Sequence, residues 1–96
     1  MAKYQVTIRF RMDEQFMTLV PSHRTYINHL IEKEIIYQYL VSMETQKVWI
    51  TFNATNKKEI EQLLIKSPLH RYWEYEIDEL FMVDGIPYRL PGVQLN

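Results

Sequence analysis

The sequence contains no cysteine and only two glycines, Gly85 and Gly92, among its 96 residues. Without cysteine the chain has no disulfides, no thiolate nucleophile and no cysteine-based zinc site. Because both glycines lie near the C-terminus, no glycine-rich loop that holds a nucleotide phosphate is present. A net charge of −1 gives no electrostatic reason to bind nucleic acid or an anionic membrane. These absences argue against nucleotide-dependent and nucleic-acid-binding functions.

Long hydrophobic runs are also missing, since none approaches the ~20 apolar residues that span a bilayer. The segment Met1-Ala2-Lys3-Tyr4 leads into an alternating pattern and not into the apolar stretch of a signal peptide. We therefore expect a cytoplasmic protein with no membrane partner. What the chain does have is a hydrophobic content of 47%, ample for a core, and a length that allows a single domain over residues 1–96.

Hydrophobic periodicity predicts the order strand, helix, strand, strand, helix, strand. The predicted ranges are 4–10, 13–33, 35–43, 46–53, 57–66 and 73–83. Pro21 falls inside the first helix, where we expect a kink or a later helix start. The order is typical of a ferredoxin-like α+β domain, βαββαβ, with a four-stranded antiparallel sheet. The remaining tail, residues 83–96, is rich in proline and glycine, and we expect it to be extended and to pack on a neighbouring subunit.

Two helices can cover only one face of a four-stranded sheet. The other face gathers charges and large apolar residues, which are Arg9, Arg11, Lys47, Trp49, Glu74, Glu76, Asp78 and Leu80. Such a mixture favours burial against a second copy, so we expect a homodimer formed through this face. The alternative is a solvated face with scattered aromatic residues and cross-strand ion pairs.

His23 is the leading candidate for chemistry. It lies on the apolar stripe of the first predicted helix, among Leu19, Val20 and Ile27. A polar side chain buried there requires a hydrogen-bond partner or has a functional role, and imidazole can act as a general base near neutral pH. The alternative is a core histidine whose ring is satisfied by a backbone carbonyl.

Further candidates follow Pro68, where Arg71 can hold a carboxylate and Tyr72 can donate to a carbonyl. Their alternative role is that of ordinary surface-loop residues. Tyr26, beside His23 on the helix, and Tyr39, otherwise a packing residue, complete the predicted substrate-binding set. The three histidines lack partners at metal-ligand spacing, so no metal site is predicted.

The run Pro68-Leu69, followed by Tyr72, Ile77-Asp78 and Leu80, resembles the corresponding stretch of muconolactone isomerases. The similarity extends from about His23 through Leu80 and includes the first strand. It implies a ferredoxin-like fold, pairing of two sheets into a dimeric α/β-barrel, and a higher ring of dimers. The implied activity is a proton shift, without a cofactor, that converts a lactone of aromatic catabolism into its enol-lactone.

The resemblance implies that the family's helix carboxylate lines up with His23 and its hairpin tyrosine with Gln46. Neither residue type is retained. Either imidazole has replaced the carboxylate as the base, or the substrate differs, or the isomerase activity is lost. Two other functions remain open: a non-catalytic dimeric barrel that binds a small hydrophobic ligand, and a YciI-like hydrolase or cofactor-free monooxygenase on the same scaffold.

Overall fold

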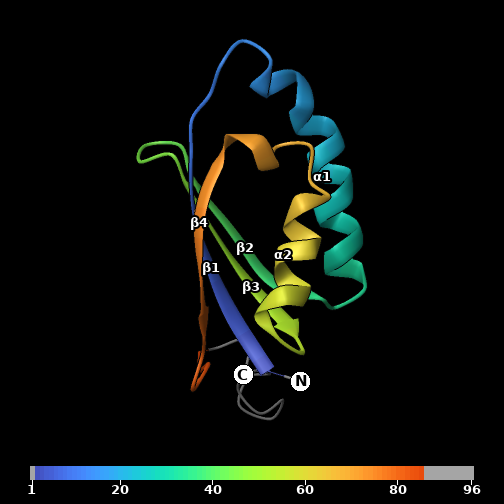
Figure 1. The fold of residues 1–96 in the computed structure, drawn as a ribbon, viewed down its shortest axis with the longest axis vertical. Coiled ribbons are helices and arrows are strands. Elements are labelled where there is room, and N and C mark those ends of the chain that lie inside the picture. The colour runs from blue at the N-terminus through green and yellow to red at the C-terminus, as the bar shows by residue number, and fades with distance from the viewer. Residues whose placement is uncertain (1, 86–96) are drawn as a thin grey trace, which may run out of the picture.

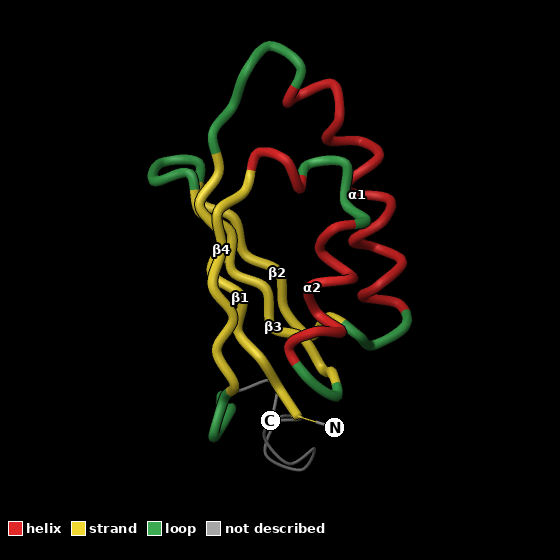
Figure 2. Tube along the Cα trace, viewed as in Figure 1, coloured by secondary structure: helices red, strands yellow, loops and turns green. Residues whose placement is uncertain are grey.

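The computed structural model describes residues 2–85, which form one sheet covered on one side by two α-helices (Figures 1 and 2). The elements are β1 (Ala2–Phe10), α1 (Phe16–Glu32), β2 (Ile36–Ser42), β3 (Lys47–Ala54), α2 (Lys57–Ile65), a 3₁₀ turn (His70–Tyr72) and β4 (Trp73–Glu79). Most of the tail predicted to pack on a neighbouring subunit lies outside the described residues. No helix of the described chain is long and apolar enough to cross a membrane.

The four strands pair in the order β2-β3-β1-β4, and every neighbouring pair is antiparallel. With one helix after β1 and one after β3, this is the ferredoxin-like βαββαβ arrangement that the periodicity predicts. The first helix begins at Phe16 and not at Asp13, because the Asp13 carboxylate accepts the backbone N–H groups of Gln15 and Phe16 from just outside the helix. Helix α1 continues through Pro21, so it does not start at the proline.

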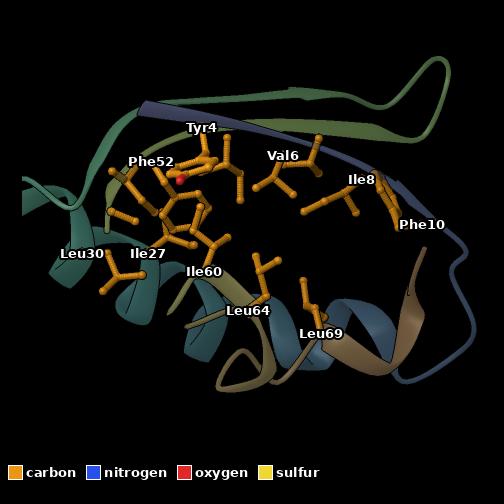
Figure 3. Close-up of a cluster of buried hydrophobic side chains, with 14 of the residues drawn as sticks. Tyr4, Val6, Ile8, Phe10, Ile27, Leu30, Phe52, Ile60, Leu64 and Leu69 are labelled. Carbon is orange, nitrogen blue, oxygen red and sulfur yellow. The ribbon is translucent and has the colours of Figure 1, made fainter. Parts of the chain in front are cut away.

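The core lies between the sheet and the two helices (Figure 3). It is built from alternate residues of β1, namely Tyr4, Val6, Ile8 and Phe10, facing Ile27 and Leu30 of α1 and Ile60 and Leu64 of α2. These side chains are at most 5% exposed, and their burial from water supplies most of the force that holds the layers together.

A β-bulge in β2 decides which tyrosine faces the helices. The register passes from the pair Ile36–Phe52 to the pair Gln38–Thr51, which leaves Tyr37 as an extra residue. Tyr37 therefore lies on the open face, where the Lys3 ammonium sits 4.6 Å from its ring centre. Tyr39 lies opposite Ile50, on the helix-covered face. Strict alternation along residues 35–43 would place Tyr37 and Tyr39 on the same face, and the bulge separates them.

The open face has the composition that the sequence predicts. Arg9 lies in register between Lys47 on β3 and Glu74 on β4, and Thr7 lies between Trp49 and Glu76. The face therefore presents basic residues of β1 and β3 beside acidic residues of β4, with Trp49 among them. Nothing in the described chain covers it, since both helices lie on the other side of the sheet (Figure 1).

Candidate functional site

His23 projects from α1 toward the sheet and is only 2% exposed. The indole of Trp73, the first residue of β4, meets its ring edge-on with 5.6 Å between the ring centres. Tyr39 of β2 approaches from the other side at 5.9 Å. The histidine is therefore buried, as the apolar stripe predicts, and it contacts one side chain from each edge strand of the sheet.

Both ring nitrogens of His23 have a hydrogen-bond partner. Nδ1 lies 2.7 Å from the hydroxyl oxygen of Ser67, which follows α2, and Nε2 lies 2.6 Å from the hydroxyl oxygen of Tyr39. A general base that contacts a ligand directly would have one nitrogen open, and this is not found. A core histidine held by a backbone carbonyl is not found either, because both partners are side-chain hydroxyls.

A cavity of about 170 Å³ lies beside this group. His23 and Tyr39 are on its wall together with Arg24, and the other lining residues are apolar: Phe10, Phe16, Met17, Val20, Val41, Met43, Val48, Leu69 and Trp73. Of these, Met17, Val41 and Met43 are at least half exposed, so they form the rim through which the cavity meets solvent. The cavity is thus an apolar chamber with a histidine–tyrosine pair on its wall.

Burial keeps both members of the pair uncharged. Removal of the ring from water and, to a smaller extent, the nearby positive charge of Arg24 together lower the pKa of His23 to about 4. Burial also raises the pKa of Tyr39 to about 12, although Arg24, whose guanidinium lies 5.3 Å from the tyrosine ring centre, acts in the opposite direction. At pH 7 the site is therefore a neutral imidazole joined to a neutral phenol.

The structure does not bring the other predicted site residues to this cavity. Tyr26 packs between the helices, where its hydroxyl donates to the carbonyl of Leu63 at 2.6 Å. Burial alone raises the pKa of its hydroxyl. Tyr26, predicted to bind substrate, is therefore not among the residues that line the cavity, because its hydroxyl is bonded to α2.

Arg71 and Tyr72 belong to a separate surface group. The Arg71 guanidinium donates to Tyr72 Oη at 2.7 Å and to Gln15 Oε1 at 2.8 Å, and the Tyr72 hydroxyl donates to Asp13 at 2.9 Å. The bond from Tyr72 holds the pKa of the exposed Asp13 carboxyl below its ordinary value. These bonds join the β1–α1 loop to the turn before β4. A shallow depression of about 620 Å³ lies over them, but its other lining residue, Glu14, is exposed like most of this group.

Ser67 is the member of the site that sequence reasoning missed. It is 5% exposed and lies between the end of α2 and Pro68. Its hydroxyl also accepts the backbone N–H of Leu69 at 3.1 Å, so it is fixed from two sides. The available signal was a serine directly after an amphipathic helix, but a serine there is usually part of a turn and gives no indication of a partner 44 residues away.

Comparison with models of protein families finds none that matches the chain, and comparison with curated proteins finds no match either. The fold and the site by themselves define a ferredoxin-like α+β domain with a histidine–tyrosine pair on the wall of a small apolar cavity.

Proposed function

We propose that the chain is an isomerase-like enzyme that catalyses a proton shift on a small lactone or related enolisable acid, with the His23 cavity as its active site. The observation that carries the proposal is the 2.6 Å contact between His23 Nε2 and Tyr39 Oη on the wall of an apolar cavity. His23 keeps the role of proton carrier that its position suggested. Tyr39 becomes the group that meets the ligand.

The size and lining of the cavity support a small ring as the ligand. A cavity of roughly 150 Å³ lined by apolar side chains is enough to bind benzene, and this one measures about 170 Å³. A lactone ring fits that space, with its carbonyl as the polar group for Tyr39. A carboxylate on the ring would extend toward the rim, where Arg24 supplies a positive charge.

The pair can carry one proton between two carbons of such a ligand. In the first step the Tyr39 oxygen takes the acidic carbon proton while its own hydrogen passes to Nε2, which leaves an imidazolium and an enolate. Both N–H groups of that imidazolium have an acceptor, Ser67 Oγ at Nδ1 and Tyr39 Oη at Nε2. The reverse transfer to a different carbon completes an isomerisation in which no net proton is consumed.

A second candidate function is binding without turnover. The observation that favours it is the pKa of about 4, which makes the imidazolium costly at neutral pH, together with the occupation of both ring nitrogens. In that case the chain holds a small hydrophobic molecule in the same cavity, and Tyr39 and His23 contribute only a polar contact. Both candidates place the ligand at the same residues, so they differ only in whether a proton moves.

The two angelica lactones, which differ in the position of one ring double bond, provide the test. If the proposal holds, the protein interconverts them, and His23→Asn lowers the rate by roughly a hundredfold or more, the usual contribution of acid–base catalysis. His29→Asn is the matched control, since His29 lies exposed on the same helix. Saturable binding of the lactones with no interconversion above the buffer rate would exclude the enzyme and leave the binding function.

A further inference from the structure

The hydroxyl of Ser67 has two hydrogen-bond contacts. Its oxygen accepts the backbone N–H of Leu69 at 3.1 Å, and it lies 2.7 Å from Nδ1 of His23. The contact with Leu69 uses a lone pair of the oxygen and leaves the hydroxyl hydrogen unassigned. Whether that hydrogen points at Nδ1 decides which nitrogen of the neutral ring carries the ring hydrogen.

Only one acceptor is available for the Ser67 hydrogen. Within residues 2–85, Nδ1 is the sole acceptor in hydrogen-bond contact with the hydroxyl, and Ser67 is 5% exposed, which leaves little access for water. If Nδ1 carried the ring hydrogen, Ser67 would accept two hydrogen bonds while its own hydrogen stayed buried without a partner. A buried donor left unpaired disfavours that arrangement by roughly five- to a hundredfold.

We infer that Ser67 is a positioning residue that holds resting His23 in the tautomer with hydrogen on Nε2. Ser67 donates to Nδ1, Nε2–H donates to Tyr39 Oη, and the hydroxyl hydrogen of Tyr39 is left for a ligand in the cavity. Each polar hydrogen of Ser67, His23 and Tyr39 then either donates a hydrogen bond within the group or is available to a ligand. Tyr39 is the terminal donor of a chain that begins at Ser67.

This arrangement limits the chemical class of the ligand, and that conclusion rests on the proposed function. A cavity whose polar wall offers a phenol hydrogen selects a ligand with a hydrogen-bond acceptor, such as the carbonyl oxygen of a lactone or ketone, over a hydrocarbon of the same shape. It also adds a condition for catalysis, because Nε2 can take a proton only after the ring changes tautomer and Ser67 turns from donor to acceptor. The resting site thus binds the carbonyl first, and proton transfer follows from the minor tautomer.

Nitrogen-15 NMR of the histidine rings tests the tautomer on the protein alone, with the His23→Asn spectrum identifying the His23 signals. The wild type should show a protonated Nε2 and an unprotonated Nδ1. Ser67→Ala should shift the Nδ1 resonance toward that of an unprotonated ring nitrogen that accepts no hydrogen bond, whereas Ser67→Thr, which keeps the hydroxyl, should match the wild type. A wild-type ring protonated on Nδ1, or an Nδ1 resonance that Ser67→Ala leaves unchanged, would overturn the role of Ser67.

Binding of cyclopentanone and of methylenecyclopentane tests the ligand class separately. The two molecules have nearly the same shape, but only the ketone accepts a hydrogen bond. Tyr39→Phe should weaken cyclopentanone binding by several-fold up to about tenfold and leave methylenecyclopentane unaffected. If Tyr39→Phe weakens the binding of the two molecules equally, the cavity does not select a carbonyl group. Because the NMR measurement uses no ligand, the tautomer can hold while the proposed enzymatic function fails, and the two failures are distinguishable.

Discussion

At the scale of single residues, the site depends on a histidine that burial keeps neutral. The pKa of His23 falls from 6.5 to about 4 because the folded protein removes the ring from water. Between these two values the unfolded chain binds more protons than the folded protein. The contribution of neutral His23 to stability is therefore complete above pH 6.5 and is lost as the pH falls toward 4.

We predict a matching change in the free energy of unfolding. Urea denaturation of the wild type between pH 7 and pH 4 should show a loss of roughly 3 kcal/mol attributable to this ring, since each pKa unit corresponds to about 1.4 kcal/mol. His23→Asn should remove that part of the loss. His29→Asn should retain it, because His23 is still present. A wild-type profile no steeper than that of His23→Asn would mean that the ring is not held neutral by burial.

The sequence indicated His23 and Tyr39 but not how they are connected. The helical stripe placed His23 under the sheet because a period of three to four residues depends only on nearby residues. The contacts with Tyr39 and Ser67 span 16 and 44 residues, and they depend on how the strand and the second helix pack. Arg71 and Tyr72 looked suited to a ligand because their chemistry is versatile, yet their side chains bind the β1–α1 loop instead.

At the scale of elements, the shortage of glycine leaves an unfavourable backbone position at the end of α1. Glu34 has a φ of 61°, in the left-handed region that favours glycine. Its N–H donates to Ile31 O and the N–H of Ile35 donates to Leu30 O, which is the Schellman arrangement that closes a helix. The hydrogen bonds of this helix end are thus complete, but the residue in its left-handed position is not glycine.

Glu34→Gly should therefore stabilise the protein by roughly 0.5–1 kcal/mol, because glycine adopts this conformation without a steric cost. Lys33→Gly is the control, since Lys33 has a φ of −82° and glycine gains nothing there. Thermal unfolding of the two variants beside the wild type provides the measurement. Equal or lower stability for Glu34→Gly than for Lys33→Gly would show that the left-handed residue carries no such cost.

The elements themselves were largely predictable, because each has a clear period and begins or ends near a recognisable residue. The helix expected over 57–66 is found at Lys57–Ile65, where the Asn56 side chain caps it by accepting the N–H of Glu59. The strand expected over 73–83 ends at Glu79. Regular pairing with β1 stops at Tyr4–Glu79, and beyond it the described chain keeps one bond, from Leu80 N–H to Lys3 O at 2.8 Å.

At the scale of the whole molecule, the open face of the sheet carries large apolar side chains that the described chain leaves partly exposed. Trp49 is half-buried at its centre, and Leu40 beside it on β2 is 47% exposed. We predict a homodimer formed through this face, which light scattering at micromolar concentration should detect. Leu40→Lys should weaken the dimer, whereas Ile65→Lys, the same kind of change at an exposed position of α2, should not. A monomeric wild type would contradict the prediction.

Hydrogen–deuterium exchange shows whether a proton moves between a bound carbonyl compound and the His23–Tyr39 pair. Cyclopentanone in heavy water exchanges the hydrogens beside its carbonyl when a base removes them, so proton NMR follows the reaction without knowledge of the natural substrate. The protein should accelerate this exchange, and Tyr39→Phe should lower the acceleration by roughly a hundredfold while Tyr37→Phe, the same change on the open face, keeps it. If cyclopentanone binds in the cavity of the wild type but exchanges no faster there than with Tyr39→Phe, the pair transfers no proton to or from the bound ketone.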